Sequence, residues 1–265
     1  MQFDFGRNWA DYSAHALNVV RVREAREAFA TLLEPAGTVT GKRFVDIGFG
    51  QGLGLLSARA MGASVVGLDI NPTCGEVLAR NAAWFPELPA IDFPVIIGSI
   101  LDADTVRRLR EASGGEGFDV VHSWGVLHHT GDMELAVRNA ASLVRPGGHL
   151  VVALYNRHWS SPAWRAIKRA YCLSPAPVRR LMVMALMPVI YAAKWLVTGR
   201  DPHRQARGMD FRYDVIDWVG GYPYEYASRD EVLAMVEPLG FRCVSCLASE
   251  VPTGCNQFAF ERVAR

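Results

Sequence analysis

The stretch from Phe44 to Leu56, FVDIGFGQGLGLL, constrains the fold more than any other part of the chain. An apolar run ends in an acidic residue, Asp46, and leads into glycines at alternate positions from Gly48 to Gly54, after which apolar residues recur at helical spacing. This order predicts a strand, a glycine turn and a helix. Glycine lets the backbone approach a bound molecule and permits positive φ, and the start of a helix offers free N–H groups. We therefore expect a ligand site at this turn.

A second apolar run, residues 63–72, also ends in an acid, Asp69. Asp69 follows Gly48 by about twenty residues, the spacing at which nucleotide-binding folds carry an acid that binds ribose hydroxyls. The alternative is that Asp69 only caps the helix that follows Pro72.

Three further strand–helix units are predicted from residues 93–106, 118–133 and 143–156, with Asp102 as a helix cap. Five such units in alternation indicate an α/β fold with a parallel sheet and helices on both faces. Ligands of such a sheet bind beyond the carboxyl ends of its strands.

The flanking segments complete a proposed domain organisation. Residues 1–35 read as a flexible aromatic lid followed by an amphipathic helix. The equal alternative is that Phe3, Phe5, Trp9 and Tyr12 only fix the terminus to the core. The strand–helix alternation stops at residue 157 and resumes at Ser228, which forms a capping-box pattern with Glu231 and precedes two strands suited to an antiparallel hairpin. We therefore predict a sheet domain from 1–156 and 228–265, and a helical cap insertion at 157–227.

The cap contains a mostly apolar span at 181–197 that is interrupted by Pro188 and Lys194. A membrane helix needs about 20 apolar residues, so we predict helices that cover the pocket. A peripheral contact with a membrane surface stays open, because basic residues are mixed with apolar ones throughout this segment.

Composition narrows the partners and the compartment. The 265 residues hold 28 Lys and Arg against 27 Asp and Glu, and this balance gives no reason to expect a nucleic-acid partner. Five scattered cysteines and the lack of a signal-peptide pattern predict a cytoplasmic protein. Cys243 and Cys246 would point to opposite faces of a strand, and nothing nearby completes a set of metal ligands, so no metal is expected.

The glycine pattern excludes two common nucleotide sites. No register of Gly48, Gly50, Gly52 and Gly54 supplies G-x-G-x-x-G/A, which disfavours a dinucleotide, and no P-loop motif occurs. The pattern DIGFGQG instead resembles the first motif of the class I S-adenosylmethionine (SAM)-dependent methyltransferases. GLDINP, FDVVHSWGVLHH and LVRPGGHLVVA resemble the later motifs of that family in the same order. The last two look most like small-molecule methyltransferases of the quinone-biosynthesis type.

The resemblance implies a Rossmann-like sheet, mostly parallel and closed by an antiparallel hairpin, with SAM as the cofactor. The glycine backbone would hold the methionine end of SAM, and Asp69 would hold the ribose hydroxyls. Ser99 stands where many relatives have an Asp that bonds to adenine. The implied cofactor-binding residues are Asp46, Gly48, Gly50, Gly52, Asp69, Ile70, Ser99, Ile100, Ser123 and Trp124.

Methyl transfer is an in-line displacement, so most of the catalysis comes from alignment, and a hydroxyl acceptor also benefits from a base. His128 and His129, just past the fourth strand, are the candidate bases, although both can equally be packing residues. Residues 207–228 are rich in aromatic and charged side chains, which suits recognition of a ring-bearing molecule, or else forms a rigid linker. The candidate acceptor-binding residues are Tyr155, Asn156, Arg207, Asp210, Trp218, Tyr222, Tyr224 and Glu225.

Together these features predict a SAM-dependent methyltransferase that acts on a small molecule, with oxygen as the favoured atom. Carbon or nitrogen methylation of a similar acceptor is the alternative within the class. A protein that binds SAM without turnover, or an accessory subunit on a membrane, is the alternative outside it. The sequence HSWG stands where base-modifying relatives carry an Asn/Asp-Pro-Pro-aromatic motif, which further disfavours a nucleic-acid substrate.

Overall fold

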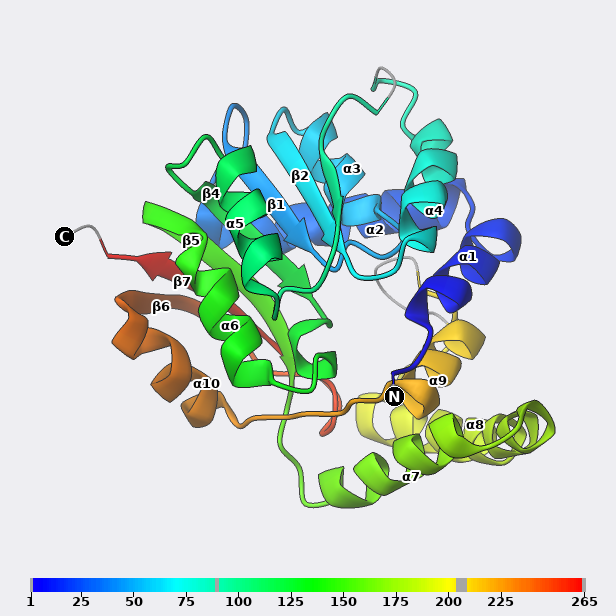
Figure 1. Cartoon of the computed structure of the whole chain (residues 1–265). Coiled ribbons are helices and arrows are strands. Elements are labelled where there is room, and N and C mark those ends of the chain that lie inside the picture. The colour runs from blue at the N-terminus through cyan, green and yellow to red at the C-terminus, as the bar shows by residue number, and fades with distance from the viewer. Residues whose placement is uncertain (1, 89–90, 204–208, 264–265) are drawn as a thin grey trace.

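The computed structural model of the chain describes residues 2–88, 91–203 and 209–263. These residues contain a seven-stranded sheet in the order β3-β2-β1-β4-β5-β7-β6 (Figure 1). The strands are β1 (Arg43–Ile47), β2 (Ser64–Asp69), β3 (Val95–Ile97), β4 (Phe118–Trp124), β5 (Val144–Tyr155), β6 (Phe241–Leu247) and β7 (Cys255–Arg262). The first five run parallel, and β7 pairs antiparallel with both β5 and β6. The predicted mostly parallel sheet with a closing hairpin is confirmed.

The sheet is covered on both faces, as the apolar strands require. Core residues of α2 (Val19–Leu33), α3 (Leu53–Ala60) and α4 (Thr73–Asn81) pack on one face. Residues of α5 (Ala103–Ala112), α6 (Met133–Ser142) and α10 (Arg229–Val236) pack on the other. Short 3-10 turns at Glu34–Ala36, Ala82–Trp84, Leu127–His129 and Glu237–Leu239 join these elements.

Local capping chemistry sets several helix starts. The Asp102 carboxylate accepts hydrogen bonds from the Asp104 and Thr105 N–H groups at the start of α5. Ser228 and Glu231 form the predicted capping box at the start of α10. These side chains satisfy amide groups that a helix start leaves without intrahelical partners.

The amino-terminal segment differs from its prediction. The sequence predicts a flexible aromatic lid, whereas the structure has a helix, α1 (Phe5–His15), which Asp4 caps. Tyr12 is fully buried, and Asn18 caps the separate helix α2. The buried side of α1 consists of Gly6, Asn8, Tyr12 and Ser13, and its packing stabilises a helix that the mixed polar and aromatic sequence does not reveal.

Three helices outside the sheet layers form a small unit of their own. α7 (Ser161–Leu173), α8 (Ala176–Thr198) and α9 (Phe211–Gly220) share an apolar cluster that includes Tyr171, Ile190 and Val215. Figure 1 shows α7 and α8 set apart from the sheet, with α9 beside α1. α8 is the one helix among the described residues that is long and apolar enough to cross a membrane, by length and composition alone.

The two cysteines of β6 lie on one face of the sheet, so the predicted opposite orientation is wrong. The register of β6 against β7 shifts between Cys243 and Ser245, and this β-bulge adds one residue between the cysteines. Both side chains pack against the same core cluster as free thiols. Among the described residues no group of His, Cys, Asp or Glu could hold a metal ion.

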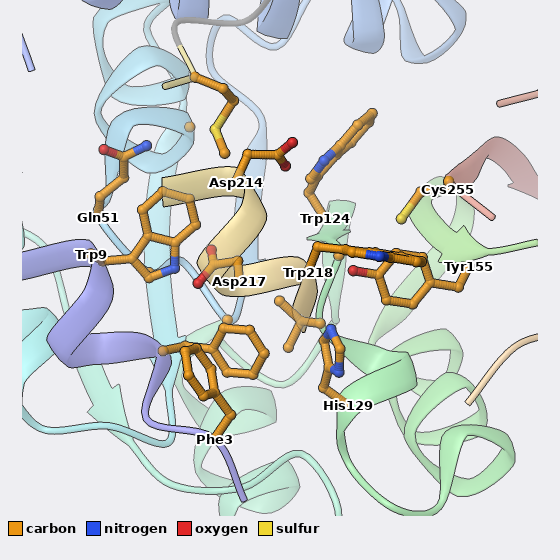
Figure 2. A pocket seen from close by; sticks show the side chains of 18 of the residues that line it. Phe3, Trp9, Gln51, Trp124, His129, Tyr155, Asp214, Asp217, Trp218 and Cys255 are labelled. Atoms are coloured by element: carbon orange, nitrogen blue, oxygen red, sulfur yellow. The ribbon is translucent and has the colours of Figure 1, made fainter. Parts of the chain in front are cut away.

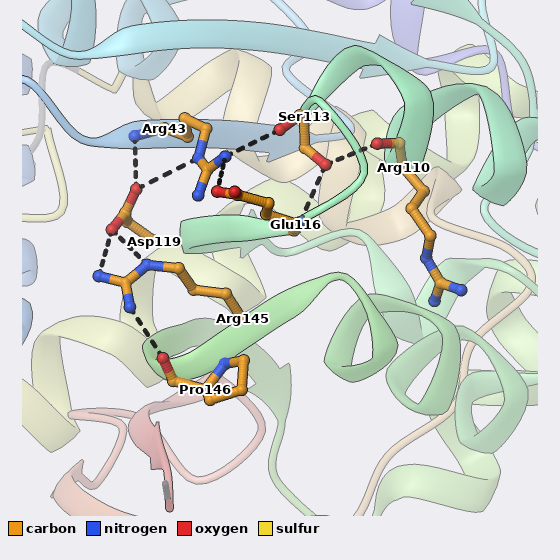
Figure 3. A network of polar contacts seen from close by, with 8 residues as sticks. Arg43, Arg110, Ser113, Glu116, Asp119, Arg145 and Pro146 are labelled. Carbon is orange, nitrogen blue, oxygen red and sulfur yellow. Dashed lines mark hydrogen bonds and ion pairs between the residues drawn. The ribbon is translucent and has the colours of Figure 1, made fainter.

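A charged network ties the amino ends of β1, β4 and β5 together (Figure 3). Asp119 accepts hydrogen bonds from the Arg43 N–H at 2.8 Å and from Arg145 Nε at 2.6 Å. Burial alone would raise the pKa of Asp119, but these bonds and the two guanidinium charges hold it below its ordinary value. The network lies at the end of β4 opposite Trp124 and so serves the fold.

Candidate active site

The glycine turn after β1 leaves no room for side chains. Gly48, Gly50 and Gly52 have φ of 75°, 55° and 82°, which L side chains rarely adopt. A Cβ on Gly48 would lie 2.5 Å from a methyl carbon of Val126, and one on Gly50 would lie 3.2 Å from Trp9 Nε1. The turn therefore needs glycine both for its conformation and for the close approach of neighbouring groups.

Two buried acids flank this turn. Asp69, at the end of β2, accepts hydrogen bonds from the Gly50 and Asn71 N–H groups, each at 2.9 Å. Burial raises the pKa of Asp69, and these N–H donors oppose the rise. Asp46 lies 2.6 Å from Nδ1 of His122, a buried partner on β4 that the sequence motifs did not single out.

A cavity of about 1090 Å³ opens beside these groups, at the carboxyl ends of the strands. The carboxyl ends of neighbouring parallel strands meet at one edge of a sheet, so residues from separate motifs converge there. α1, α2, α7, α8, α9 and the loop at residues 248–254 contribute further walls. The predicted site residues that line the cavity are Asp46, Gly48, Gly50, Asp69, Ile70, Ser99, Ile100, Trp124, His129, Tyr155 and Trp218.

Two predicted cofactor residues and one predicted base lie outside the cavity wall. Gly52 is the N-cap of α3, and the Ser123 hydroxyl donates to the Ile47 carbonyl at 2.9 Å. His128 is fully buried, and its Nδ1 accepts from the Tyr155 N–H at 3.2 Å. Through these contacts the three residues hold the backbone of elements that line the cavity.

Most residues predicted to bind the acceptor support the cap and its loops. Glu225 accepts from the Gly131 and Met133 N–H groups, and Asp210 caps α9 and pairs with Arg21 at 2.7 Å. The remaining members of that set have structural contacts as well. The Tyr222 carbonyl accepts from the Phe3 N–H, the Tyr224 carbonyl accepts from Arg165, and the Asn156 side chain donates to the Pro252 carbonyl. Arg207 lies outside the described residues.

Aromatic rings wall a chamber of the cavity. Figure 2 shows Trp218, Tyr155, Trp124, Trp9 and Phe3 around the same space as His129 and Asp217. The rings of Tyr155 and Trp218 meet edge to face, with centroids 5.3 Å apart. Such walls suit a ring-bearing molecule.

Asp217, on α9, is a buried acid in this chamber. Its Oδ1 accepts from Asn8 Nδ2 of α1 at 2.6 Å. Burial raises the pKa of Asp217 to about 8, and the Asn8 bond opposes the rise. The aromatic and acidic composition of residues 207–228 was a signal for it, but Asn8 is 209 positions away, and nothing local predicts that contact.

His129 faces the same chamber as a neutral imidazole. Its Nδ1 lies 2.6 Å from the Pro223 carbonyl. Because a carbonyl only accepts, Nδ1 carries the proton, and Nε2 is left as the acceptor. Burial lowers the pKa of His129 to about 3, although the Pro223 bond raises it.

A buried lysine lies behind the aromatic wall. Lys168 is fully buried; its Nζ donates to the Trp218 carbonyl and lies 4.0 Å from the centroid of the Trp218 ring. Burial lowers the pKa of Lys168 to about 7. Its positive charge also opposes the rise in the pKa of Asp217.

The site as a whole fits SAM. The turn without side chains lets a ligand approach the backbone closely, Asp69 can accept bonds from a diol, and Asp46 lies within the same cavity. Gln51 also lines the cavity, and its buried Oε1 has no hydrogen-bond partner among the described residues. An ammonium group would supply such a donor. Fold and site together define the class I SAM-dependent methyltransferases.

Comparison with known proteins gives the same class. A model of the methyltransferase domain family matches residues 20–245, and the chain belongs to this family. It is 33% identical over 167 residues to a ubiquinone biosynthesis O-methyltransferase of Mesorhizobium japonicum, covering 62% of each chain. A relative of the same name from Brucella ovis is 34% identical over 139 residues, covering 52% of this chain and 50% of its own. The chain thus spans between half and about three fifths of the length of these relatives.

Solved structures agree on the fold. The magnesium protoporphyrin IX methyltransferase from Synechocystis PCC 6803, with bound SAH, superposes with a TM-score of 0.56 over 97% of this chain and 93% of its own. The two sequences are 14% identical, so this likeness concerns the fold alone.

Proposed function

We propose that the protein transfers the methyl group of SAM to a hydroxyl oxygen of a small, ring-bearing acceptor. The observation that carries this proposal is the cavity itself. One continuous space links the glycine turn and Asp69 to an aromatic chamber that holds Asp217 and His129. A cofactor and an acceptor bound at its two ends would meet inside it, and alignment of this kind is the larger part of methyl-transfer catalysis.

The cofactor end is assigned to the sheet. The backbone at Gly48 and Gly50 would hold the methionine part of SAM, with Asp46 and Gln51 as acceptors for its amino group. Asp69 would accept hydrogen bonds from the ribose hydroxyls, and Ile70 would cover the adenine. When bound, SAM supplies a sulfonium-activated methyl group.

The acceptor end is assigned to the cap, for which we retain residues 157–227. α7 contributes Trp164 to the cavity wall, α8 contributes Ile190, and α9 contributes Asp217 and Trp218. The names of the relatives also favour oxygen as the methylated atom.

Asp217 is the better proton acceptor of the two groups in the chamber. A base is most effective when its pKa is near the working pH, and the pKa is about 8 for Asp217 against about 3 for His129. We assign proton removal to Asp217 and positioning of the hydroxyl to Nε2 of His129. Ionisation of Asp217 would then make the transfer rate rise with pH and level off above about pH 8.

The test uses labelled SAM with the whole protein and a series of catechols that carry alkyl chains of increasing length. We expect an O-methylated product, identified by mass spectrometry and NMR. Asp217→Asn should bind SAM normally in calorimetry and lose at least about a hundredfold in turnover, the lower range for a general base. Transfer to carbon or nitrogen, or saturable SAM binding with no transfer to any acceptor in a cell extract, would refute the proposal.

A further inference from the structure

The outer side of α8 is an apolar surface that the described residues leave uncovered. Leu181, Met184, Val189 and Leu196 are 64%, 69%, 59% and 74% exposed, and they follow one stripe along the helix. Only 6% of the most apolar 18-residue window of α8 is buried. Exposed apolar surface of this extent on one helix marks a site of interaction.

The charges within the segment that carries this stripe have a single sign, and acids begin at Asp201, beyond the end of α8. From residue 135 to residue 200 the chain contains no Asp or Glu, while Arg180 lies exposed on α8 next to Leu181, and Arg169 lies exposed on the preceding helix, α7. Lys194, inside α8, pairs with Asp214 of α9 and so is directed toward the protein. The free charge of this surface is therefore positive.

Two tryptophans of this acid-free segment are exposed. Trp195 is 53% exposed beside Leu196, and Trp159, just before α7, is 86% exposed. Tryptophan is favoured where an apolar environment meets a polar one, as at the headgroup level of a bilayer.

We propose that α7 and α8 dock the protein on the surface of an anionic lipid bilayer, with α8 lying in the plane of the interface. The apolar stripe would enter the boundary between headgroups and acyl chains, and Arg169 and Arg180 would contact anionic headgroups. The opposite side of α8 lines the cavity through Ile190, Ala193, Lys194 and Val197. The docked helix would therefore separate the bilayer from the acceptor chamber.

Two other uses of this surface fit less well. If α8 spanned the membrane, it would have to separate from α9 and break the Lys194–Asp214 ion pair. Pro188 also lies inside this helix. A second copy of the chain in a two-fold contact would bring this acid-free segment against itself, which opposes like charges.

The proposal is tested by flotation of the whole protein with vesicles, without SAM or acceptor. We expect flotation with phosphatidylcholine vesicles that contain phosphatidylglycerol, and much less with pure phosphatidylcholine. The double variant Leu181→Glu/Leu196→Glu should stay unbound, and Arg180→Gln should weaken binding about fivefold. Val19→Glu is the matched control, since Val19 is 69% exposed on α2, and it should float like the parent.

Failure of the parent protein to float with anionic vesicles would overturn the proposal, as would flotation of the Leu181→Glu/Leu196→Glu variant. Equal flotation with both lipids would overturn the assignment to an anionic surface. A dimer in light scattering that the double variant abolishes would assign the stripe to a second copy. None of these results depends on methyl transfer, so the two proposals fail separately.

Discussion

Substitution of Asp217 by Asn should stabilise the protein, and the gain should depend on pH. The pKa of Asp217 is about 8 in the folded chain against 3.8 for an ordinary Asp. Between these values the unfolded chain has released the proton and the folded chain still holds it. The folded state therefore binds more protons in this window, and its stability falls as pH rises from about 4 to about 8.

The size of the effect follows from the same two values. Each pH unit in this window lowers the free energy of unfolding by about 1.4 kcal/mol. The raised pKa of Asp217 therefore lowers that free energy by on the order of 4 kcal/mol at pH 7. The asparagine side chain of the variant would keep an oxygen to accept the bond from Asn8 Nδ2 but would not titrate. We expect the free energy of unfolding of Asp217→Asn to exceed that of the parent by a few kcal/mol at neutral pH.

Urea denaturation of both proteins at pH 5, 6, 7, 8 and 9 measures this difference. Other titrating groups are common to the two chains and largely cancel. The difference should grow up to about pH 8 and then level off. Asp230→Asn is the control, because the Asp230 side chain is 91% exposed, and it should leave the stability unchanged within about 0.5 kcal/mol. A difference that stays constant across pH, or an Asp217→Asn variant that is less stable than the parent at pH 8, would show that burial does not raise the pKa of Asp217.

Three further substitutions test other parts of the structure. Gly50→Val should abolish SAM binding in calorimetry while the protein still folds. The added side chain would contact Trp9 in the cavity, and Gly50 has a positive φ that valine rarely adopts. Unchanged affinity would contradict the cofactor assignment. Asp119→Ala should lower the free energy of unfolding by about 3 kcal/mol at pH 7, since it leaves Arg43 and Arg145 without their shared carboxylate. The lowered pKa of Asp119 means that this contribution exists above about pH 4 and fades as pH falls further, so an equal loss at pH 3 and pH 7 in urea titrations would refute it. Lys168→Met removes a charge that holds the pKa of Asp217 down, so the rise of the methyl-transfer rate should move to higher pH; an unmoved profile would separate Asp217 from the base.

The cofactor half of the site could be predicted because its signals are local. A glycine turn between a strand and a helix, and acids at two strand ends, are set by the conformation of a few consecutive residues. The parallel sheet then brings Asp46, Asp69 and Ser99 to one edge without further information. The same holds for the caps at Asp102 and Ser228.

The acceptor half depended on tertiary packing. His128 and His129 are neighbours in sequence, yet only His129 lines the cavity, because the turn at Leu127–His129 directs the two rings differently. The acidity of Asp217 depends on burial by α1 and on Asn8, at the other end of the chain. The bulge in β6 likewise moved Cys243 and Cys246 onto one face. By itself the sequence determined the cofactor turn and the alternation of strands and helices along the chain, because both arise from short-range backbone preferences. Only the tertiary structure decided which side chains meet in the chamber, because their burial and charge come from segments far apart in the chain.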